Sequence, residues 1–191
     1  MALLNTAAAW GWPAKTLHWM VAVLVIGMLM LGFTMVWLVS GLGTKFQLYQ
    51  LHKSFGVLVW ALVVVRLVWR WLNSRVPTLP PELKPWERAA ASLTHRGFYV
   101  LLLVLPITGW IMASASPLGV PTMVFGLFTL PDLVGPDAAL EQVMKLVHGG
   151  LALAVAALLA LHVAAALKHH FVLRDHVLAR MLPGIATRAG R

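Results

Sequence analysis

The chain has 191 residues, of which 60% are hydrophobic and 11% charged, and its formal net charge is +9. A mean hydropathy of +0.83 is typical of an integral membrane protein, in which positive charge indicates basic flanks of membrane spans rather than binding of nucleic acid. The absence of cysteine excludes disulfides, thiolate-bound iron–sulfur clusters and covalent c-type haem attachment.

The N-terminal half contains two stretches that are expected to cross a membrane as helices. No Asp, Glu, Lys or Arg occurs in residues 16–44, which predicts a first helix over about residues 16–39. This stretch is too long for a signal-peptide core and lacks a basic leader, so we expect it to be retained. Glycines then predict a turn, and a second helix is expected over residues 51–72, with Arg66 near its far end.

The C-terminal half contains two further candidate spans. Residues 73–88 include four of the eleven prolines and predict a loop outside the membrane. A third helix is expected over residues 92–113, where neighbouring helices can accommodate Pro106. The stretch 114–136 is rich in proline and glycine but still apolar, so we expect a loop on the membrane surface rather than a fifth span. A fourth helix is expected over residues 138–173.

These elements predict an all-α membrane protein, a four-transmembrane-helix bundle in which residues 1–191 form a single domain. Twelve lysines and arginines lie on the side of the termini, and three lie on the other side, namely Lys45, Lys53 and Lys145. Under the positive-inside rule, both termini are expected to be cytoplasmic.

Histidines occur inside these apolar spans, where ionisable side chains indicate a functional site. His148 and His162 share a stretch without charges, and fourteen residues of helix rise about 21 Å in close to four whole turns. The two imidazoles are therefore expected on one face, one near each side of the membrane. By depth, His18 at the inner start of the first helix pairs with His162, and His52 at the outer start of the second pairs with His148.

Two neutral imidazoles at one depth suit the two axial positions of a haem iron in a helical bundle. A single membrane histidine is more often a donor in a helix–helix hydrogen bond, but two depth-matched pairs favour haem. Four ligands spread over about 21 Å cannot share one zinc ion, whose ligand distances are about 2 Å. Gly56, Gly149 and Gly150 lie close to these histidines in the sequence and are expected to let the backbone approach a flat macrocycle.

At this point the chain resembles a known family, the bacterial cytochrome b561 proteins, which are four-helix membrane cytochromes with two b haems. The resemblance covers nearly the whole chain and rests on an ordered set of short motifs. The motifs are Leu17-His18-Trp19, Leu51-His52-Lys53, Val65-Arg66-Leu67, Leu105-Pro106-Ile107-Thr108-Gly109-Trp110, Phe125-Gly126-Leu127, His148-Gly149, Leu161-His162 and Lys168-His169-His170. The lead-in Trp10-Gly11-Trp12-Pro13 departs from the basic, tyrosine-containing lead-in of many members.

The resemblance implies two heme b groups in a protein of the bacterial inner membrane. The family's ligand pattern falls on four histidines that agree with the depth argument. They are His18, His52, His148 and His162.

Other polar residues of the chain would either contact a haem or quinone, or lie at the membrane surface without a role in the site. Arg66 lies fourteen residues from His52, which places it at inner-haem depth, where it would either pair with a haem propionate or extend to lipid headgroups. His95 and His169 would contact quinone or a propionate beside the inner haem, and Lys168 would join them in lining a quinone site. Otherwise His169 belongs to a solvated basic helix end.

The outer lysines Lys53 and Lys145 flank the expected outer ligands and would form a positive rim that attracts a small anion such as superoxide. Lys45 is as readily explained by interfacial anchoring. One named member of the family is a superoxide:ubiquinone oxidoreductase, so the resemblance implies this activity here, with ubiquinone as the electron acceptor.

The resulting hypothesis is transmembrane electron transfer through two b haems to the quinone pool. Two alternatives remain open: an electron-transfer subunit for a dehydrogenase or a periplasmic partner, and a haem-free transporter that uses the same histidines. The expected partners are membrane lipid, ubiquinone, and superoxide or a periplasmic electron donor. Purified protein without a Soret band would leave only the transporter.

Overall fold

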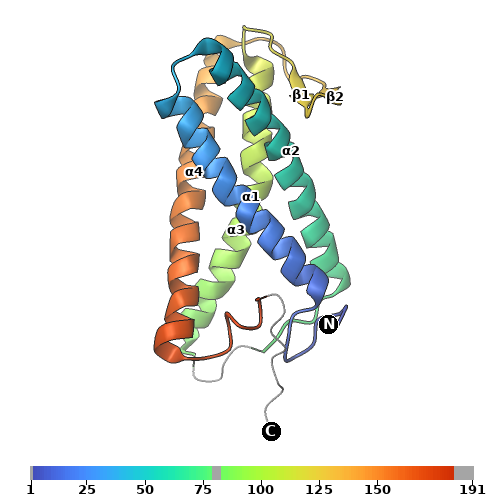
Figure 1. The fold of residues 1–191 in the computed structure, drawn as a ribbon, viewed down its shortest axis with the longest axis vertical. Helices are drawn as coiled ribbons and strands as arrows, with labels where there is room; N and C mark the ends of the chain where they lie inside the picture. Colours follow the sequence, from blue (N-terminus) through green and yellow to red (C-terminus); the bar gives the residue numbers. More distant parts are fainter. Residues whose placement is uncertain (1, 79–82, 183–191) are drawn as a thin grey trace.

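The computed structural model describes residues 2–78 and 83–182, and four long helices run along its longest axis (Figure 1). All four are long and apolar enough to cross a membrane, which confirms the predicted helical membrane bundle. In chain order they are α1 (Trp12–Phe33) with a π-helical continuation η1 (Thr34–Leu38), α2 (Leu42–Leu72), α3 (Pro85–Ala115), and α4 (Ala138–Leu167) with a π-helical continuation η2 (Lys168–Leu173).

Helices α1, α2 and α3 begin earlier than the sequence predicts, α1 at Trp12 rather than at residue 16. Helix α2 begins at Leu42 rather than at residue 51, with Gly41 in an extended N-cap conformation. Helix α3 begins at Pro85 rather than at residue 92, because proline is favoured in a first turn and the Glu87 side chain accepts the Lys84 backbone N–H. Hydropathy detects only the apolar part of each helix, so the polar first turns were missed.

Consecutive helices pack against one another, α1 against α2, α2 against α3, and α3 against α4. The described ends of the chain lie at one end of the bundle, which we call the inner end, and the opposite end is the outer end (Figure 1). A buried apolar cluster lies between the two ends and draws on all four helices. Its buried members are Val21, Val25, Val59, Val63, Leu102 and Val155.

The segment between α3 and α4 contains a two-stranded antiparallel hairpin of β1 (Thr122–Val124) and β2 (Phe128–Leu130). The two turn residues have positive φ, 49° at Phe125 and 73° at Gly126, as in the tight turns that match the twist of a hairpin. A loop without a fifth span was predicted here, and the hairpin within it was not.

The inner end is held together by contacts of the terminal segments. The buried Asn5 side chain donates to the carbonyls of Asn73 and Arg75 and accepts from the backbone N–H of Gly11. The Trp19 indole N–H donates to the carbonyl of Met181 at 2.8 Å. The segment before α1 is thereby joined to the end of α2, and the segment after η2 returns to α1.

Candidate functional site

The structure brings the four candidate ligands together as two facing pairs. The ring centroids of His18 on α1 and His162 on α4 lie 6.2 Å apart, and we call these two residues the inner pair. The ring centroids of His52 on α2 and His148 on α4 lie 6.3 Å apart, and these form the outer pair. The pairs are those expected from depth.

The separation within each pair fits a metal ion held between two imidazoles. A metal–nitrogen bond of about 2.0 Å on each side, plus about 1.1 Å from each nitrogen to its ring centre, gives a centroid separation of about 6.2 Å. Across residues 2–78 and 83–182, no group of three or more histidine or acidic side chains is placed to hold a metal ion. A metal here would therefore have two protein ligands, as in a bis-histidine haem.

His148 is held by α3 in a defined tautomer. Its Nδ1 lies 3.1 Å from the carbonyl oxygen of Leu105 and 3.1 Å from the hydroxyl oxygen of Thr108, which itself donates to the Leu105 carbonyl. Because a carbonyl oxygen only accepts, Nδ1 must carry the proton, and Nε2 keeps the lone pair that a metal requires. This is the second hydrogen bond by which proteins usually orient a metal-ligating imidazole.

Two glycines lie against the outer pair. A Cβ at Gly109 on α3 would come within 3.0 Å of His148 Cε1, and a Cβ at Gly32 on α1 would come within 3.4 Å of His52 Cε1. The sequence predicted no role for either glycine or for Thr108, although Thr108 and Gly109 lie in one of the motifs of the resemblance. The signal available was an isolated Thr-Gly pair just after Pro106, in the middle of an apolar helix.

The glycines chosen from the sequence lie elsewhere. A Cβ at Gly56 would be in ordinary contact with Met28, at 3.7 Å. A Cβ at Gly149 or Gly150 would meet no described atom within 4 Å, so both positions face open space. They therefore remain compatible with a close macrocycle, whereas Gly56 packs against a side chain.

Two of the other three ligand candidates, His18 and His52, have a buried ring nitrogen, Nδ1, without a hydrogen-bond partner among the described residues. Buried polar atoms are normally paired, so each unpaired atom calls for an explanation such as an absent group or water. Together with the spacing of each pair, these atoms fit sites built around a further group.

Aromatic rings surround His162 in the inner pair. Its ring packs edge-on against His95 and Phe98, with centroids 5.6 Å and 5.5 Å away. The structure therefore brings His95 to the inner pair, as the sequence predicts.

Arg66 also lies beside the inner pair, at the depth expected from its spacing to His52. Its guanidinium carbon lies 5.7 Å from the ring centre of Tyr99, within range of a cation–π contact. The same charge lies within electrostatic reach of His18 and His162. A half-buried cation at this point can balance an acidic group bound near the inner pair.

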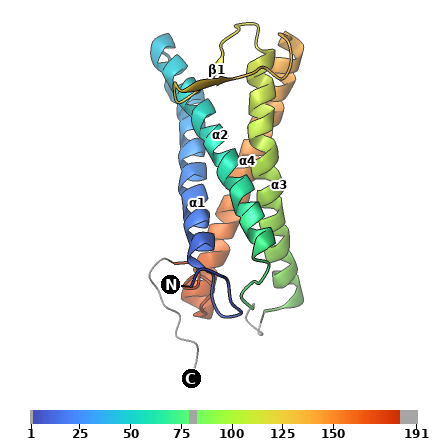
Figure 2. The same ribbon diagram turned by 90° about the vertical axis from the view of Figure 1, so that its right-hand side faces the viewer.

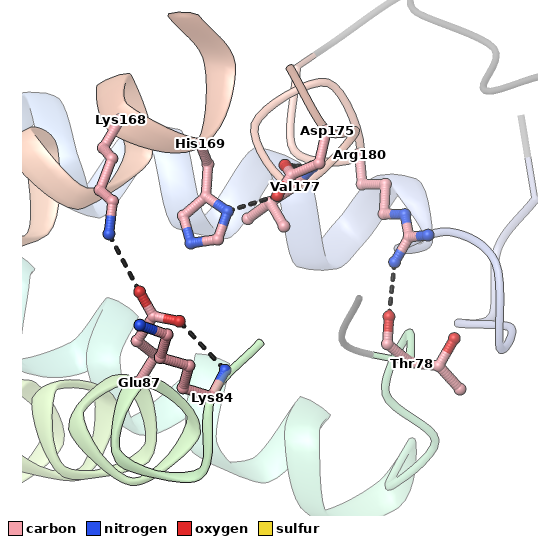
Figure 3. Close-up of polar contacts among 8 residues, drawn as sticks. All are labelled: Thr78, Lys84, Glu87, Lys168, His169, Asp175, Val177 and Arg180. Atoms are coloured by element: carbon pink, nitrogen blue, oxygen red, sulfur yellow. Dashed lines mark hydrogen bonds and ion pairs between the residues drawn. The ribbon is translucent and has the colours of Figure 1, made fainter. Parts of the chain in front are cut away.

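The other inner residues predicted to line a quinone site are both paired with carboxylates (Figure 3). Lys168 Nζ lies 3.0 Å from Glu87 Oε1 and thereby joins η2 to the start of α3. His169 Nδ1 pairs with Asp175, whose other carboxylate oxygen accepts the backbone N–H of Val177. Sequence reasoning did not anticipate either acidic partner.

The two candidate outer lysines differ in their surroundings. Lys53 Nζ donates to the carbonyls of Val120 at 3.2 Å and Pro121 at 3.5 Å, and Asp132 lies within its electrostatic reach. The Lys53 ammonium is thus held in place by backbone carbonyls, and its charge is partly offset by Asp132. Lys145, in contrast, is exposed on α4, three residues before His148.

Comparison with known proteins gives consistent matches over most of the chain. A family model described as prokaryotic cytochrome b561 matches residues 9–184. Cytochrome b561 homolog 2 of Escherichia coli (strain K12) is 36% identical over 182 residues, which cover 95% of each chain. Cytochrome b561 homolog 1 of the same organism is 31% identical over 87% of this chain and 93% of its own. The probable superoxide oxidase CybB of Yersinia pestis is 30% identical over 87% of this chain and 92% of its own.

The contact of Gly109 with His148 generates a first prediction. Gly109→Ala is expected to push the imidazole out of its hydrogen bonds and to lower haem affinity at the outer pair about tenfold, as loss of ligand-orienting contacts commonly does. Gly43→Ala is the matched control, because a Cβ there would meet no described atom within 4 Å. The haem-to-protein ratio, measured by absorbance, tests this prediction. Full haem content in Gly109→Ala would show that the contact does not position His148.

Proposed function

The chain belongs to the prokaryotic cytochrome b561 family, and we propose that it transfers electrons from superoxide to ubiquinone through two b haems. The family binds b-type haem and transfers electrons in membranes, so this chain is a multi-pass membrane oxidoreductase. Membership thereby disfavours the haem-free transporter.

The two facing histidine pairs carry the proposal of two haems. We assign the outer pair (His52 and His148) and the inner pair (His18 and His162) as the axial ligands, because each pair has the spacing that an iron atom requires. The pairs are separated by fourteen residues of α4, which is about 21 Å along the helix axis. Two redox groups so placed would connect the two membrane surfaces.

A bound b haem supplies reversible one-electron chemistry at its iron. The residues of this chain hold neutral imidazoles in place, and the buried valines and leucine between the pairs exclude water from the middle of the bundle. Arg66 is assigned to a haem propionate at the inner pair, since its charge reaches both inner ligands.

Orientation follows from charge. The two described chain ends lie at the same end of the bundle (Figure 1), together with most of the basic residues. By the positive-inside rule this end faces the cytoplasm of a bacterial inner membrane, and the outer pair lies near the periplasmic surface.

Superoxide as the donor is supported by a relative and by charge. The Yersinia pestis relative is named a probable superoxide oxidase. Lys53 adjoins His52 in the sequence, and Lys145 lies near His148, so a small anion would be attracted to the outer pair. Each superoxide would give up one electron and leave as oxygen, and two such electrons with two protons would convert ubiquinone to ubiquinol.

We place ubiquinone at the inner end, beside His95, His169 and Lys168. Polar hydrogen-bonding groups lie there at the edge of an apolar bundle, which is the usual composition of a small-molecule site. The alternative is an electron-transfer subunit that serves a dehydrogenase or a periplasmic partner, since the two Escherichia coli relatives are named only as cytochrome b561 homologs. Steady-state haem reduction by superoxide, followed by oxidation by quinone, separates the two.

The haem assignment predicts which substitutions remove which haem. His52→Ala and His148→Ala should each abolish the outer haem, and His18→Ala and His162→Ala should each abolish the inner one, because one imidazole cannot maintain bis-histidine ligation. Redox titration followed by absorbance identifies the remaining haem. Loss of the same haem in His18→Ala and His52→Ala would contradict the pairing.

The donor assignment predicts a salt-dependent reaction. Superoxide should reduce the outer haem rapidly, and Lys53→Glu with Lys145→Glu should slow this step about 10-fold or more at low salt, because the positive rim becomes negative. Pulse radiolysis at several salt concentrations measures the rate, and Lys45→Glu provides a comparison on the same surface. A rate that ignores both salt and charge reversal would show that the lysines only anchor the protein.

The acceptor assignment predicts slow haem oxidation without haem loss. His169→Ala should slow oxidation by a soluble ubiquinone analogue, because a hydrogen-bonding group for the quinone is removed while the haem ligands stay in place. Stopped-flow absorbance measures this rate, with His176→Ala as a control for a general loss of basic residues at this end. Unchanged quinone kinetics in both His95→Ala and His169→Ala would exclude this placement.

A further inference from the structure

Near the outer end of the bundle, the β1–β2 segment crosses between α3 and α2 (Figure 2). We call residues 116–137 the strap. Strand β1 (Thr122–Val124) packs against both α2 and α3. The strap is therefore placed to set the separation of these two helices at the level of the outer pair.

A buried serine on α2 holds one side of the strap. The Ser54 hydroxyl lies 2.9 Å from the carbonyl of Gln50 and 3.2 Å from the carbonyl of Met123, and it accepts the backbone N–H of Phe125 at 2.9 Å. Ser54 is 3% exposed, so an unpaired group here would be costly. The attachment uses strap backbone atoms, so it depends little on the strap's own side chains.

A second buried serine, on α3, holds the other side in the same way. The Ser114 hydroxyl donates to the carbonyl of Trp110 at 2.9 Å and accepts the backbone N–H of Leu133 at 3.1 Å. The indole N–H of Trp110 adds a bond to the carbonyl of Pro131 at 3.0 Å. Each serine therefore bonds one turn back along its own helix and receives an N–H from the strap.

Each member of the outer pair depends on one of the two helices that the strap joins. His52 lies two residues before Ser54 on α2, so a shift of this turn of α2 would move its imidazole. His148 is hydrogen-bonded to the backbone of Leu105 and to Thr108, both on α3. Because α4 carries His148 and α3 orients its ring, a change in the α2–α3 separation would also change the distance between the two imidazoles.

The turn of the hairpin shows that the strap is held firmly. Phe125 has φ of 49°, a left-handed conformation that is unfavourable for a bulky residue. Its backbone N–H is bound by Ser54, and its ring packs edge-on against Phe55 with centroids 5.2 Å apart. Backbone strain persists only where the surrounding contacts determine the conformation, and here those contacts are with α2.

We propose that the strap fixes the His52–His148 separation and that Ser54 and Ser114 are positioning residues for the outer haem. The proposal rests on the assignment of a haem to the outer pair. The inner pair lies at the other end of the bundle, away from the strap, and is independent of it.

The test uses Ser54→Ala and Ser114→Ala, with Ser92→Ala, an exposed serine of α3, as the control. A bis-histidine haem has no open position for carbon monoxide. Loosening the pair in either test variant should raise the carbon monoxide-reactive fraction of reduced haem about tenfold, and only at the outer haem. Repeating the measurement in a His18→Ala background, which is expected to keep only the outer haem, identifies the haem that reacts.

A second measurement needs no haem. Because the chain has no cysteine, spin labels can be attached at Phe46→Cys on α2 and Ile107→Cys on α3, both exposed positions. The distance distribution between the labels should broaden in each test variant and stay unchanged in Ser92→Ala.

Unchanged label distances together with unchanged carbon monoxide binding would overturn the proposal. Equal reactivity of both haems would also overturn it, since that result indicates general destabilisation. If the haem pairing itself fails, the label distances still decide whether the strap sets the α2–α3 separation.

Discussion

The constraint on which this structure depends is that one helix, α4, supplies an imidazole at each of two depths. Fourteen residues separate His148 from His162, so both point to one face of the helix, about 21 Å apart. The other helices then have to bring a partner to each depth. Because α1 and α2 run in opposite directions, His18 and His52, each in the first half of its helix, lie toward opposite ends of the bundle.

The two pairs are supported in different ways. His148 is oriented by hydrogen bonds from α3, which fix its tautomer and raise the basicity of a ligating imidazole. His162 is instead surrounded by the rings of His95 and Phe98, with the Arg66 charge nearby. One member of the outer pair, His148, is thus held by directional bonds, whereas His162 of the inner pair is held by packing and electrostatics.

The sequence predicted the features that follow from one helix at a time. Hydropathy gave the four spans, and the 3.6-residue period placed His148 and His162 on one face of α4. Features that depend on contact between two distant chain segments were not predictable. Gly109 is distinguished from other helical glycines by its contact with His148. Ser54 is important because the strap returns to α2 and binds it. Local patterns carry no information about which distant backbone atom will occupy a given position.

A single turn of α2 shows how ligand placement and support are divided. Gln50 and Ser54, four residues apart, both bind strap carbonyls, and Lys53 between them binds the carbonyls of Val120 and Pro121. At about 100° per residue, His52 lies about 200° around the helix from both Gln50 and Ser54. One face of this turn therefore binds the strap while the opposite face presents the imidazole. The strap that contacts this turn also binds Lys53, so under the proposed positioning role, changes in the strap would alter the geometry and the electrostatics of the outer site together.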